Sequence, residues 1–320
     1  MNILPILDIE PAKIVKLWNE SIGETFPMTE KLWIQNSINE PNILKTASIA
    51  ILEGNELLGF IVAKRYQENL QAAMPSHIGW IQCMLVKESA RNHGIGSRMI
   101  KHTEQIFQEA QLTEFRLGRD PWHYFPGVPV EDQHAIEWFE KRGYVKESIE
   151  TDLTRVVEST TPYTLENSEN HFRVLTQEDL PSLLQFLEHA FPGRWHYEAI
   201  HYSLKKGSGR EFMGFFINDQ LQGFCRMNDS TSPLIAQNVY WSGLFEGELG
   251  GIGPLGINRS IRGGHYGLDL VKASANELMR RNVSNIVIDW TQLVPFYEKL
   301  GFTAWKQYQT MGKTVSIEKG

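Results

Sequence analysis

In the first part of the chain, the spacing of apolar residues alternates between that of helices and that of strands. Apolar residues recur at helical spacing over 12–19 and 29–38, and two apolar runs follow at 47–52 and 57–64. The Gly-Asn turn between these runs predicts a β-hairpin. The remaining blocks predict, in order, a strand over 78–86, a helix over 94–110, a strand over 114–117, a Pro- and Gly-rich loop over 118–130 and a helix over 132–142.

A polar segment, 158–170, interrupts this pattern. It contains Pro162 and has neither a helical nor a strand period, so it predicts a linker. Beyond the linker the same kinds of block return: a strand over 171–175, a helix over 177–190, a hairpin of 211–217 and 221–227, a strand region bordered by 239–241 and 253–257, a helix over 267–281, a strand over 285–289 and a helical turn over 294–300.

Three short matches in the same order indicate an internal repeat. They are Leu57-Leu58-Gly59-Phe60 with Leu221-Gln222-Gly223-Phe224, the equal spacing of Val86 to Arg91 and Ile257 to Arg262, and Trp138-Phe139-Glu140-Lys141-Arg142-Gly143-Tyr144 with Phe296-Tyr297-Glu298-Lys299-Leu300-Gly301-Phe302. The sequence therefore predicts two copies of one α+β domain, over 1–157 and 171–320, joined by the linker.

Composition narrows the class of protein. A 320-residue chain that is 42% hydrophobic and 22% charged suits two globular domains. The net charge of −7 and a pI near 5.8 provide no broad basic field, so we expect no nucleic-acid partner. Two cysteines, Cys83 and Cys225, fall in different halves, which favours a reducing, cytoplasmic setting without disulfides. We expect neither a signal peptide nor a membrane span, because the sequence has no basic-then-apolar leader and no long apolar run.

The segment Val86-Lys87-Glu88-Ser89-Ala90-Arg91-Asn92-His93-Gly94-Ile95-Gly96-Ser97 connects a predicted strand to a predicted helix. The first amides of a helix are unpaired and lie at the positive end of its dipole, and glycines let an anion approach them closely. This loop therefore predicts a phosphate or pyrophosphate site. The alternative is a tight turn that needs glycine only for its geometry.

Here the chain resembles the GNAT superfamily of N-acetyltransferases, whose hallmark is Arg/Gln-x-x-Gly-x-Gly/Ala after a strand. Arg91-Asn92-His93-Gly94-Ile95-Gly96 fits this pattern without departure. The resemblance implies that the loop from Arg91 to Ser97 binds the pyrophosphate of acetyl-CoA, and that Met84, Leu85 and Val86 bind its pantetheine arm. It also implies a central, mixed, mostly antiparallel sheet flanked by helices in each half. Duplicated domains of this kind are similar to the arrangement in the mycothiol synthase family.

The second half departs from the hallmark. Its loop reads Arg262-Gly263-Gly264-His265-Tyr266-Gly267, so that His265 replaces the first motif glycine. A histidine there either obstructs a phosphate or donates a hydrogen bond to it. The resemblance still marks a second set of coenzyme-binding candidates: Leu255, Ile257, Arg262, Gly263, Gly264, Tyr266 and Gly267.

The catalytic candidates follow from the last helix and from the segment before the coenzyme strand. In many GNAT enzymes a tyrosine of the last helix protonates the coenzyme-A thiolate, and Tyr297 matches that position, whereas the first half has Phe139. A thiolate with a pKa of about 8.5 can also leave unaided, so such an acid assists without being essential. Glu248 and Glu246 are candidates for the general base; the alternative is that both are exposed turn residues.

Other motifs are weaker. The segment 120–129 is an insertion relative to the second half, and it either lines an acceptor pocket or packs against the other domain. Gly251-Ile252-Gly253-Pro254-Leu255-Gly256 matches a dinucleotide-binding motif, but no helix opens directly after it, so we expect a strand. His196 and His201 lack a metal-site pattern, and we expect no metal.

The sequence thus predicts an acetyl-CoA-dependent N-acetyltransferase that transfers the acetyl group to a primary amine in a ternary complex. The alternative is a non-catalytic acyl-CoA-binding protein with degenerate domains. The acidic net charge favours a small cationic amine over a protein as the acceptor, whose identity the sequence does not specify.

Overall fold

A computed structural model describes residues 1–157, 161–167 and 171–316, and its contacts divide the chain into two units. The first unit contains Met1–Asn69, Pro75–Glu150 and the described residues from Gln307 onward. The second contains Leu70–Met74 and Thr151–Lys306. Parts of the expected linker, 158–160 and 168–170, lie outside the described residues.

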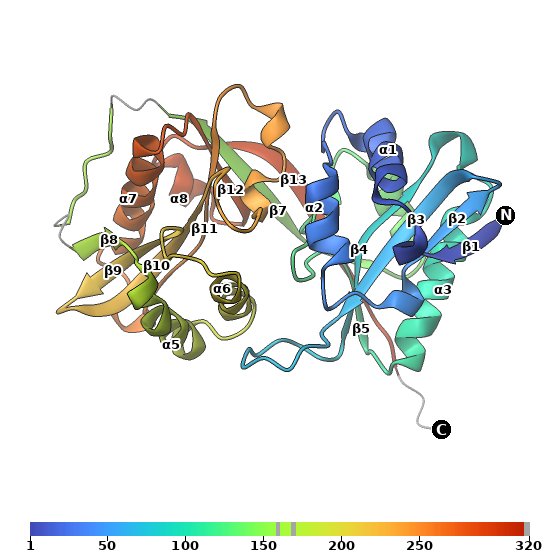
Figure 1. Cartoon of the computed structure of the whole chain (residues 1–320), viewed down its shortest axis with the longest axis horizontal. Helices are drawn as coiled ribbons and strands as arrows, with labels where there is room; N and C mark the ends of the chain where they lie inside the picture. The colour runs from blue at the N-terminus through green and yellow to red at the C-terminus, as the bar shows by residue number, and fades with distance from the viewer. Residues whose placement is uncertain (158–160, 168–170, 317–320) are drawn as a thin grey trace. The chain divides into compact units, whose positions relative to one another are not determined.

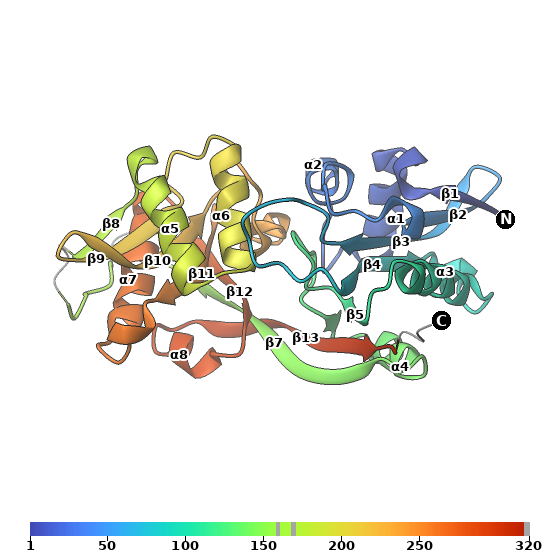
Figure 2. The same cartoon turned by 90° about the horizontal axis from the view of Figure 1, so that it is seen from below.

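The first unit is a twisted sheet with helices on both faces. Its strands are β1 (Asn2–Pro5), β2 (Ile49–Glu53), β3 (Glu56–Arg65), β4 (Ile78–Val86), β5 (Glu114–Leu117), β6 (Val128–Pro129) and the end of β13 (Thr303–Thr314). Its helices are α1 (Pro11–Ile22), α2 (Glu30–Trp33), α3 (Ile95–Glu109) and α4 (Gln133–Glu140). The strand order is β1-β2-β3-β4-β5-β13, and only β4 and β5 run parallel. Figure 2 shows α1 and α2 on one face of this sheet and α3 on the other.

The second unit repeats this plan. Its strands are the end of β7 (Val145–Val156), β8 (Phe172–Val174), β9 (Phe212–Ile217), β10 (Gln220–Asn228), β11 (Leu249–Ile257) and β12 (Asn285–Thr291). Its helices are α5 (Leu180–Ala190), α6 (Arg194–Leu204), α7 (Tyr266–Arg280) and α8 (Val294–Glu298). The order is β8-β9-β10-β11-β12-β7, with only β11 and β12 parallel. The expected mixed, mostly antiparallel sheet is therefore confirmed in both units.

Each unit buries a large apolar core between its sheet and the long helix that lies on the sheet in Figure 1. In the first unit Met99 and Phe107 of α3 pack on Ile61 and Phe115 of the sheet. In the second unit Leu270, Val271 and Leu278 of α7 play the same part. The buried residues of α3 recur mostly at three- and four-residue spacing, whereas α7 is buried continuously from Asp269 to Ala275 and again at Leu278 and Met279.

Two long strands are divided between the units. Thr151 to Val156 of β7 pair with β12 of the second unit, although β7 follows the last helix of the first repeat. In return, Gly312 to Thr314 of β13 pair with β5 of the first unit. Each sheet is thus completed by the strand that follows the other repeat, and here the units differ from the expected ranges 1–157 and 171–320.

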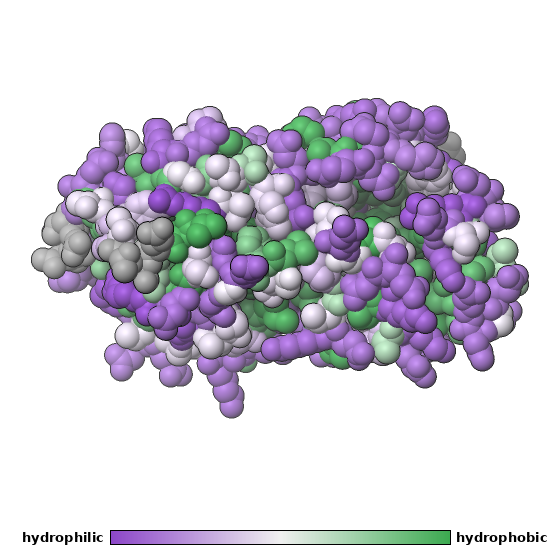
Figure 3. Space-filling view, turned by 90° about the horizontal axis from the view of Figure 1, so that it is seen from above, coloured by the Kyte–Doolittle hydropathy of each residue, from purple (hydrophilic) through white to green (hydrophobic). Residues whose placement is uncertain are grey.

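The described part of the chain contains no helix long and apolar enough to cross a membrane. The face seen in Figure 3 is mostly hydrophilic, with separate apolar patches.

Candidate active site

The parallel strand pair of the first unit separates part-way along its length. β4 and β5 pair from Ile78 with Glu114 to Ile81 with Leu117, and no pairing is recorded beyond that point. The register between β3 and β4 shifts at the same level, so that Gln82 is an extra residue in β4. Such a bulge bends the strand. The predicted pantetheine strand, Met84 to Val86, therefore leaves its neighbour and presents unpaired backbone groups to the opening.

The predicted phosphate loop of the first unit has the geometry of an anion site. Arg91 Nε donates to the Val86 carbonyl at 3.3 Å, which folds the loop back on the strand. Gly94 precedes α3 with φ 79°, a left-handed conformation, and a Cβ built on it would meet nothing within 4 Å. The open space lies over the first amides of the helix, where Ile95, Gly96 and Ser97 begin α3.

Further contacts involve Arg142, Trp138 and His93 and surround this loop. Arg142 Nη2 donates to Ser97 Oγ at 2.8 Å, while the guanidinium lies 3.4 Å from the centre of the Trp138 ring. A Cβ on Gly96 would lie 3.3 Å from Trp138. Asn92 also takes a left-handed conformation, and Nδ1 of His93 lies 2.7 Å from the Arg91 carbonyl oxygen. These contacts fix the loop from Arg91 to Ser97 in one shape.

Behind the opening of the first unit lies a fully buried ion cluster. Lys64 Nζ is 3.1 Å from Glu40 Oε2 and 2.7 Å from Asp120 Oδ2, and all three side chains have no exposed surface. Lys64 also donates to the Pro121 carbonyl at 2.7 Å. Burial and the Asp120 charge raise the pKa of the nearby Cys83 thiol. The lysine and its two carboxylates thus fill this side of the sheet with paired charges.

The inserted loop contacts aromatic and polar residues of its own unit. Tyr124 of this loop stacks on Trp33 with 6.1 Å between ring centres and meets Trp18 edge-on at 5.2 Å. Its hydroxyl lies 2.9 Å from Ser37 Oγ. Only 3% of Tyr124 is exposed, and Phe139, at the position of the second repeat's tyrosine, is 8% exposed. Buried aromatic side chains therefore pack beside the inserted loop of the first unit.

The parallel pair of the second unit opens in the same way. β11 and β12 pair from Leu249 with Asn285 to Gly251 with Val287. Asp289 lies two residues further along β12, where the next partner on β11 would be Gly253. A Cβ built on Gly253 would be 3.6 Å from Asp289 Oδ1. The carboxylate of Asp289 therefore occupies the gap between the separating strands, and its side chain is partly exposed.

The surroundings of Asp289 change its acidity. Burial, followed by the negative charges of Asp152 and Glu198, raises the pKa of Asp289 to about 7. The hydrogen bond that it accepts from Asn238 opposes this rise. A carboxylate with a pKa near 7 exchanges a proton readily at neutral pH, which is what a general base needs.

Tyr297 of α8 belongs to the same part of the second unit. It is 6% exposed and packs in the core cluster with Cys225, Ile252 and Ile288. Burial raises the pKa of its hydroxyl, and the nearby Cys225 thiol and Asp289 carboxyl raise it further. The phenol therefore keeps its proton at neutral pH. Its hydroxyl makes no hydrogen bond to any residue that the structure describes, so the proton is available to another group.

The loop of the second unit repeats the geometry of the first. Arg262 Nε donates to the Ile257 carbonyl at 3.3 Å. His265 takes the left-handed conformation of Gly94, with φ 61°, and Tyr266 then begins α7. The imidazole Nδ1 of His265 lies 3.3 Å from Glu166 Oε2. The backbone thus reproduces the turn without glycine, and the histidine ring lies beside a carboxylate of the segment that follows the first repeat.

The other predicted base lies elsewhere. Glu248 directly precedes Leu249, at the closed end of the parallel pair, and its Oε1 accepts a hydrogen bond from the Ser230 amide at 3.0 Å. Glu246, two residues earlier, uses its carbonyl to accept from Asn285 Nδ2 at 2.6 Å. The structure therefore brings neither glutamate to the opening that contains Asp289.

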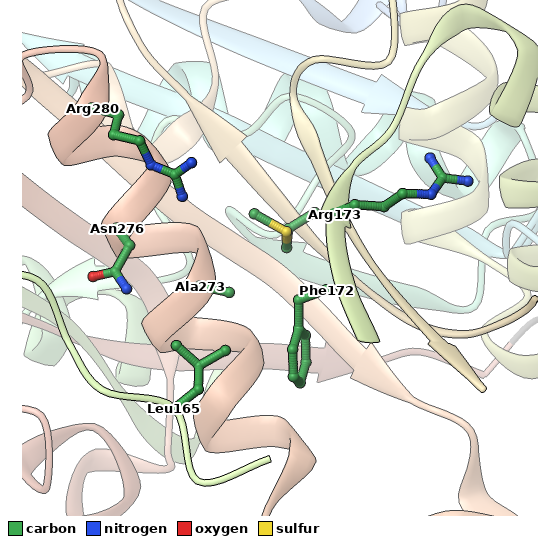
Figure 4. Close-up of a pocket in the computed structure, with 7 residues that line it drawn as sticks. Leu165, Phe172, Arg173, Ala273, Asn276 and Arg280 are labelled. Carbon is green, nitrogen blue, oxygen red and sulfur yellow. The ribbon is translucent and has the colours of Figure 1, made fainter. Parts of the chain in front are cut away.

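A hollow of about 460 Å³ lies between α7 and the strands β8 and β9 of the second unit (Figure 4). It is lined by Leu165, Phe172, Arg173, Met213, Ala273, Asn276 and Arg280. Both arginines are engaged, Arg173 with Asp179 and Arg280 with Glu277. No lining residue belongs to β11, β12 or the loop 262–267, so this hollow is separate from the opening.

Asp289 and Asn238 were not among the residues expected from the sequence. Asp289 directly follows the apolar run Ile286-Val287-Ile288, and a carboxylate at the end of a buried strand next to the coenzyme strand is the signal that identifies it. Asn238 lies in a 3₁₀ turn (Gln237–Val239), directly before the segment 239–241 that was expected only to border a strand. Nothing in its local pattern distinguishes it.

Comparison with known proteins agrees with this architecture. Residues 14–144 match the Acetyltransferase (GNAT) family. A search of curated proteins finds no match. Among solved structures, a GCN5-related N-acetyltransferase from Sphaerobacter thermophilus is 13% identical with a TM-score of 0.71, covering 98% of this chain and 95% of its own. A tandem GNAT protein from the clavulanic acid biosynthesis pathway is 13% identical with a TM-score of 0.68, at 98% coverage of both chains.

A third structure contains a glucosamine N-acetyltransferase region of a fungal multi-domain β-N-acetylglucosaminidase. It is 19% identical with a TM-score of 0.84 over 97% of this chain. This chain covers 38% of that longer protein. At these identities the likeness shows the fold, which is that of two tandem GNAT domains.

Proposed function

We propose that this chain, which has the fold of tandem GNAT acetyltransferases, transfers an acetyl group from acetyl-CoA to a primary amine, and that the transfer takes place in its second unit. One relationship carries the proposal: Asp289, whose pKa lies near 7, occupies the gap between the parallel strands, and the buried phenol of Tyr297 is near enough for the Asp289 charge to raise its pKa. Groups whose environments separate their acidities in this way suit the base and acid of one reaction.

The chemical step needs only these two groups and the two substrates. The amine nitrogen attacks the thioester carbonyl carbon, and the nitrogen loses a proton to the Asp289 carboxylate. The carbon–sulfur bond then breaks, and the departing sulfur takes the proton of the Tyr297 hydroxyl. The products are the amide and coenzyme A with a free thiol, and the proton on Asp289 balances the one that Tyr297 gave up.

Coenzyme binding is proposed for the strand and loop of the second unit. Leu255 and Ile257 lie beyond the point where β11 leaves β12, so their backbone groups suit the pantetheine arm. Gly263, Gly264, Tyr266 and Gly267 surround the first turn of α7, whose amides suit the pyrophosphate. Arg262 holds this loop against β11 through the Ile257 carbonyl.

The first unit lacks the corresponding chemistry. Phe139 replaces the tyrosine, and the paired charges of Lys64, Glu40 and Asp120 fill the interior behind its opening. Its loop from Arg91 to Ser97 nevertheless retains the geometry of a coenzyme site. We therefore propose that the first unit binds coenzyme without transferring the acetyl group.

The acceptor is proposed to be a small amine. The opening contains the carboxyl group of Asp289, and a carboxylate there favours an amine as the ligand. Because the fungal structure of the same fold is described as a glucosamine N-acetyltransferase, amino sugars are the first acceptors to test.

The experiment measures release of the coenzyme-A thiol from acetyl-CoA with glucosamine and a panel of alkyl and aryl amines. We expect turnover by the wild type, and a loss of about 10²–10⁴-fold in kcat/KM for Asp289→Asn. The control is Asp179→Asn, a partly buried carboxylate paired with Arg173 outside the opening. Full activity of Asp289→Asn, or no acetylated amine with any acceptor, would contradict the proposal.

A further inference from the structure

Asn238 joins the carboxylate of Asp289 to the neighbouring strand. Its Nδ2 donates to Asp289 Oδ1 at 3.0 Å and to the Gly253 carbonyl of β11 at 3.3 Å. Only 3% of Asn238 is exposed. One amide group therefore bridges the two strands at the level where their own pairing has ended.

A second asparagine fixes the orientation of this amide. Asn228 Nδ2, at the end of β10, donates to Asn238 Oδ1 at 3.1 Å. Because the oxygen of Asn238 accepts this bond, its nitrogen must be the atom that faces Asp289. Asn228 has no exposed surface, so water does not compete for this contact.

The backbone of β11 is shaped around the same side chain. A Cβ built on Gly251 would lie 1.9 Å from Asn238 Oδ1 and 2.2 Å from its Cγ. Any other residue at Gly251 must therefore displace Asn238. Gly251 is also the last β11 residue paired with β12, so the space for Asn238 begins where the strands separate.

The charged and titratable groups around Asp289 come from several elements. Asp152 lies on β7 and its Oδ1 accepts a hydrogen bond from the Trp290 amide at 2.9 Å. Glu198 of α6 is paired with Arg226 of β10 at 3.3 Å. Cys225 of β10 and Tyr297 of α8 complete the set and are uncharged at neutral pH. Asn238 differs from these acidic neighbours because it is neutral and donates a hydrogen bond to Asp289.

We propose that Asn238 is a positioning residue that holds the Asp289 carboxylate in the gap between β11 and β12, in the orientation required to accept a proton from the acceptor amine. This inference rests on the function proposed above. A hydrogen bond donated to a carboxylate stabilises its charged form. Asn238 therefore also keeps Asp289 ionised at lower pH than its acidic neighbours alone would allow.

The test is the pH dependence of kcat/KM for the full chain with acetyl-CoA and the best acceptor. Asn238→Ala removes the donor, so the acidic limb should move to higher pH by about one unit, with about a fivefold loss at pH 7 that recovers by pH 9. Asn238→Asp replaces the donor with a second negative charge, so the acidic limb of its pH profile should move further to higher pH. Gly251→Ala, which displaces Asn238 without altering it, should move the limb in the same direction.

Asn276→Ala is the matched control, because Asn276 is an asparagine of α7 that bonds to Tyr163 and lies outside the opening. A purely structural role would lower the rate at every pH and leave the limb in place. That result, in Asn238→Ala and Gly251→Ala alike, would overturn the inference. Failure of the proposed function is distinct: wild type would then be inactive, or Asp289→Asn would keep the wild-type profile.

Discussion

Gly118 of the first unit and Asp289 of the second unit occupy equivalent positions in the two repeated sheets. The parallel pairing of β5 starts at Glu114 and that of β12 starts at Asn285, and each of the two residues lies four positions later. At this position the first unit has a glycine, which has no side chain, and the second unit has the carboxylate of Asp289. The repeats thus differ at the position from which a base reaches the gap between the strands.

The raised pKa of Asp289 predicts a stability that depends on pH. A carboxyl that ionises near pH 7 in the folded protein and near pH 4 when unfolded binds more protons in the folded state between these values. Stability is therefore retained below pH 4 and lost as the pH rises to about 7. Asp289→Asn should raise the free energy of unfolding at pH 8 by about 1–3 kcal/mol, as measured by urea denaturation.

The same substitution should change little at pH 4, because the wild-type carboxyl is then mostly neutral in the folded state. Equal stabilisation at pH 4 and pH 8 would mean that Asp289 ionises normally. It would then contradict the proposal that Asp289 is the general base.

Tyr297→Phe tests the proposed acid. Removing the hydroxyl should lower kcat about tenfold and leave the KM of acetyl-CoA unchanged, because the thiolate is a fair leaving group without assistance. Steady-state kinetics at saturating acceptor measures this. Tyr163→Phe is a control, since that hydroxyl donates to the Leu300 carbonyl outside the opening. Equal rates for wild type and Tyr297→Phe would exclude the phenol as the acid.

The two coenzyme loops can be tested at equivalent positions. Gly94→Glu and His265→Glu each place a carboxylate before the first turn of a long helix, where an anion is expected. We expect His265→Glu to raise the KM of acetyl-CoA by about tenfold or more, and Gly94→Glu to remove one equivalent of bound coenzyme in calorimetry while turnover persists.

Since Gly94 has a positive φ, Gly94→Asn controls for backbone strain, because asparagine tolerates that conformation. His265→Gly is the neutral control in the second unit. If Gly94→Glu loses turnover and His265→Glu does not, acetyl transfer takes place in the first unit and the proposal is contradicted.

The buried charges of the first unit predict a large loss of stability. Lys64→Met leaves the carboxylates of Glu40 and Asp120 buried without their cation, which costs about 3–5 kcal/mol. Denaturant unfolding of the full chain measures it. Lys16→Met removes an exposed pair with Glu20 and should change stability by less than about 1 kcal/mol. Comparable effects of the two substitutions would show that the cluster is not a closed ion network.

Periodic apolar residues made much of each sheet predictable. The hairpins and the long helices α3 and α7 were placed from their apolar faces, and the phosphate loop from the strand and helix on either side. In contrast, β7 was not predicted, because Lys146, Glu147 and Asp152 break its alternation. The helix α6 was missed because its buried face contains polar residues, His196 and Glu198.

The site was predictable only in part, for a related reason. Tyr297 and the loop residues repeat between the halves, so comparison within the chain locates them. Asp289 has no counterpart in the first half, where Gly118 stands, and a polar residue at a strand end resembles an ordinary turn. Asn238 acquires its role from contacts with Gly253 and Asn228, which its neighbours in sequence do not specify.

The divided strands β7 and β13 have a consequence for how the protein is made on the ribosome. β13 supplies Gly312 to Thr314 to the first unit's sheet, so β5 keeps an unpaired edge until the whole second repeat has been translated. Exposed strand edges invite pairing with other chains. We therefore expect a truncated product that ends in the linker to keep this open edge and to pair with other chains through it.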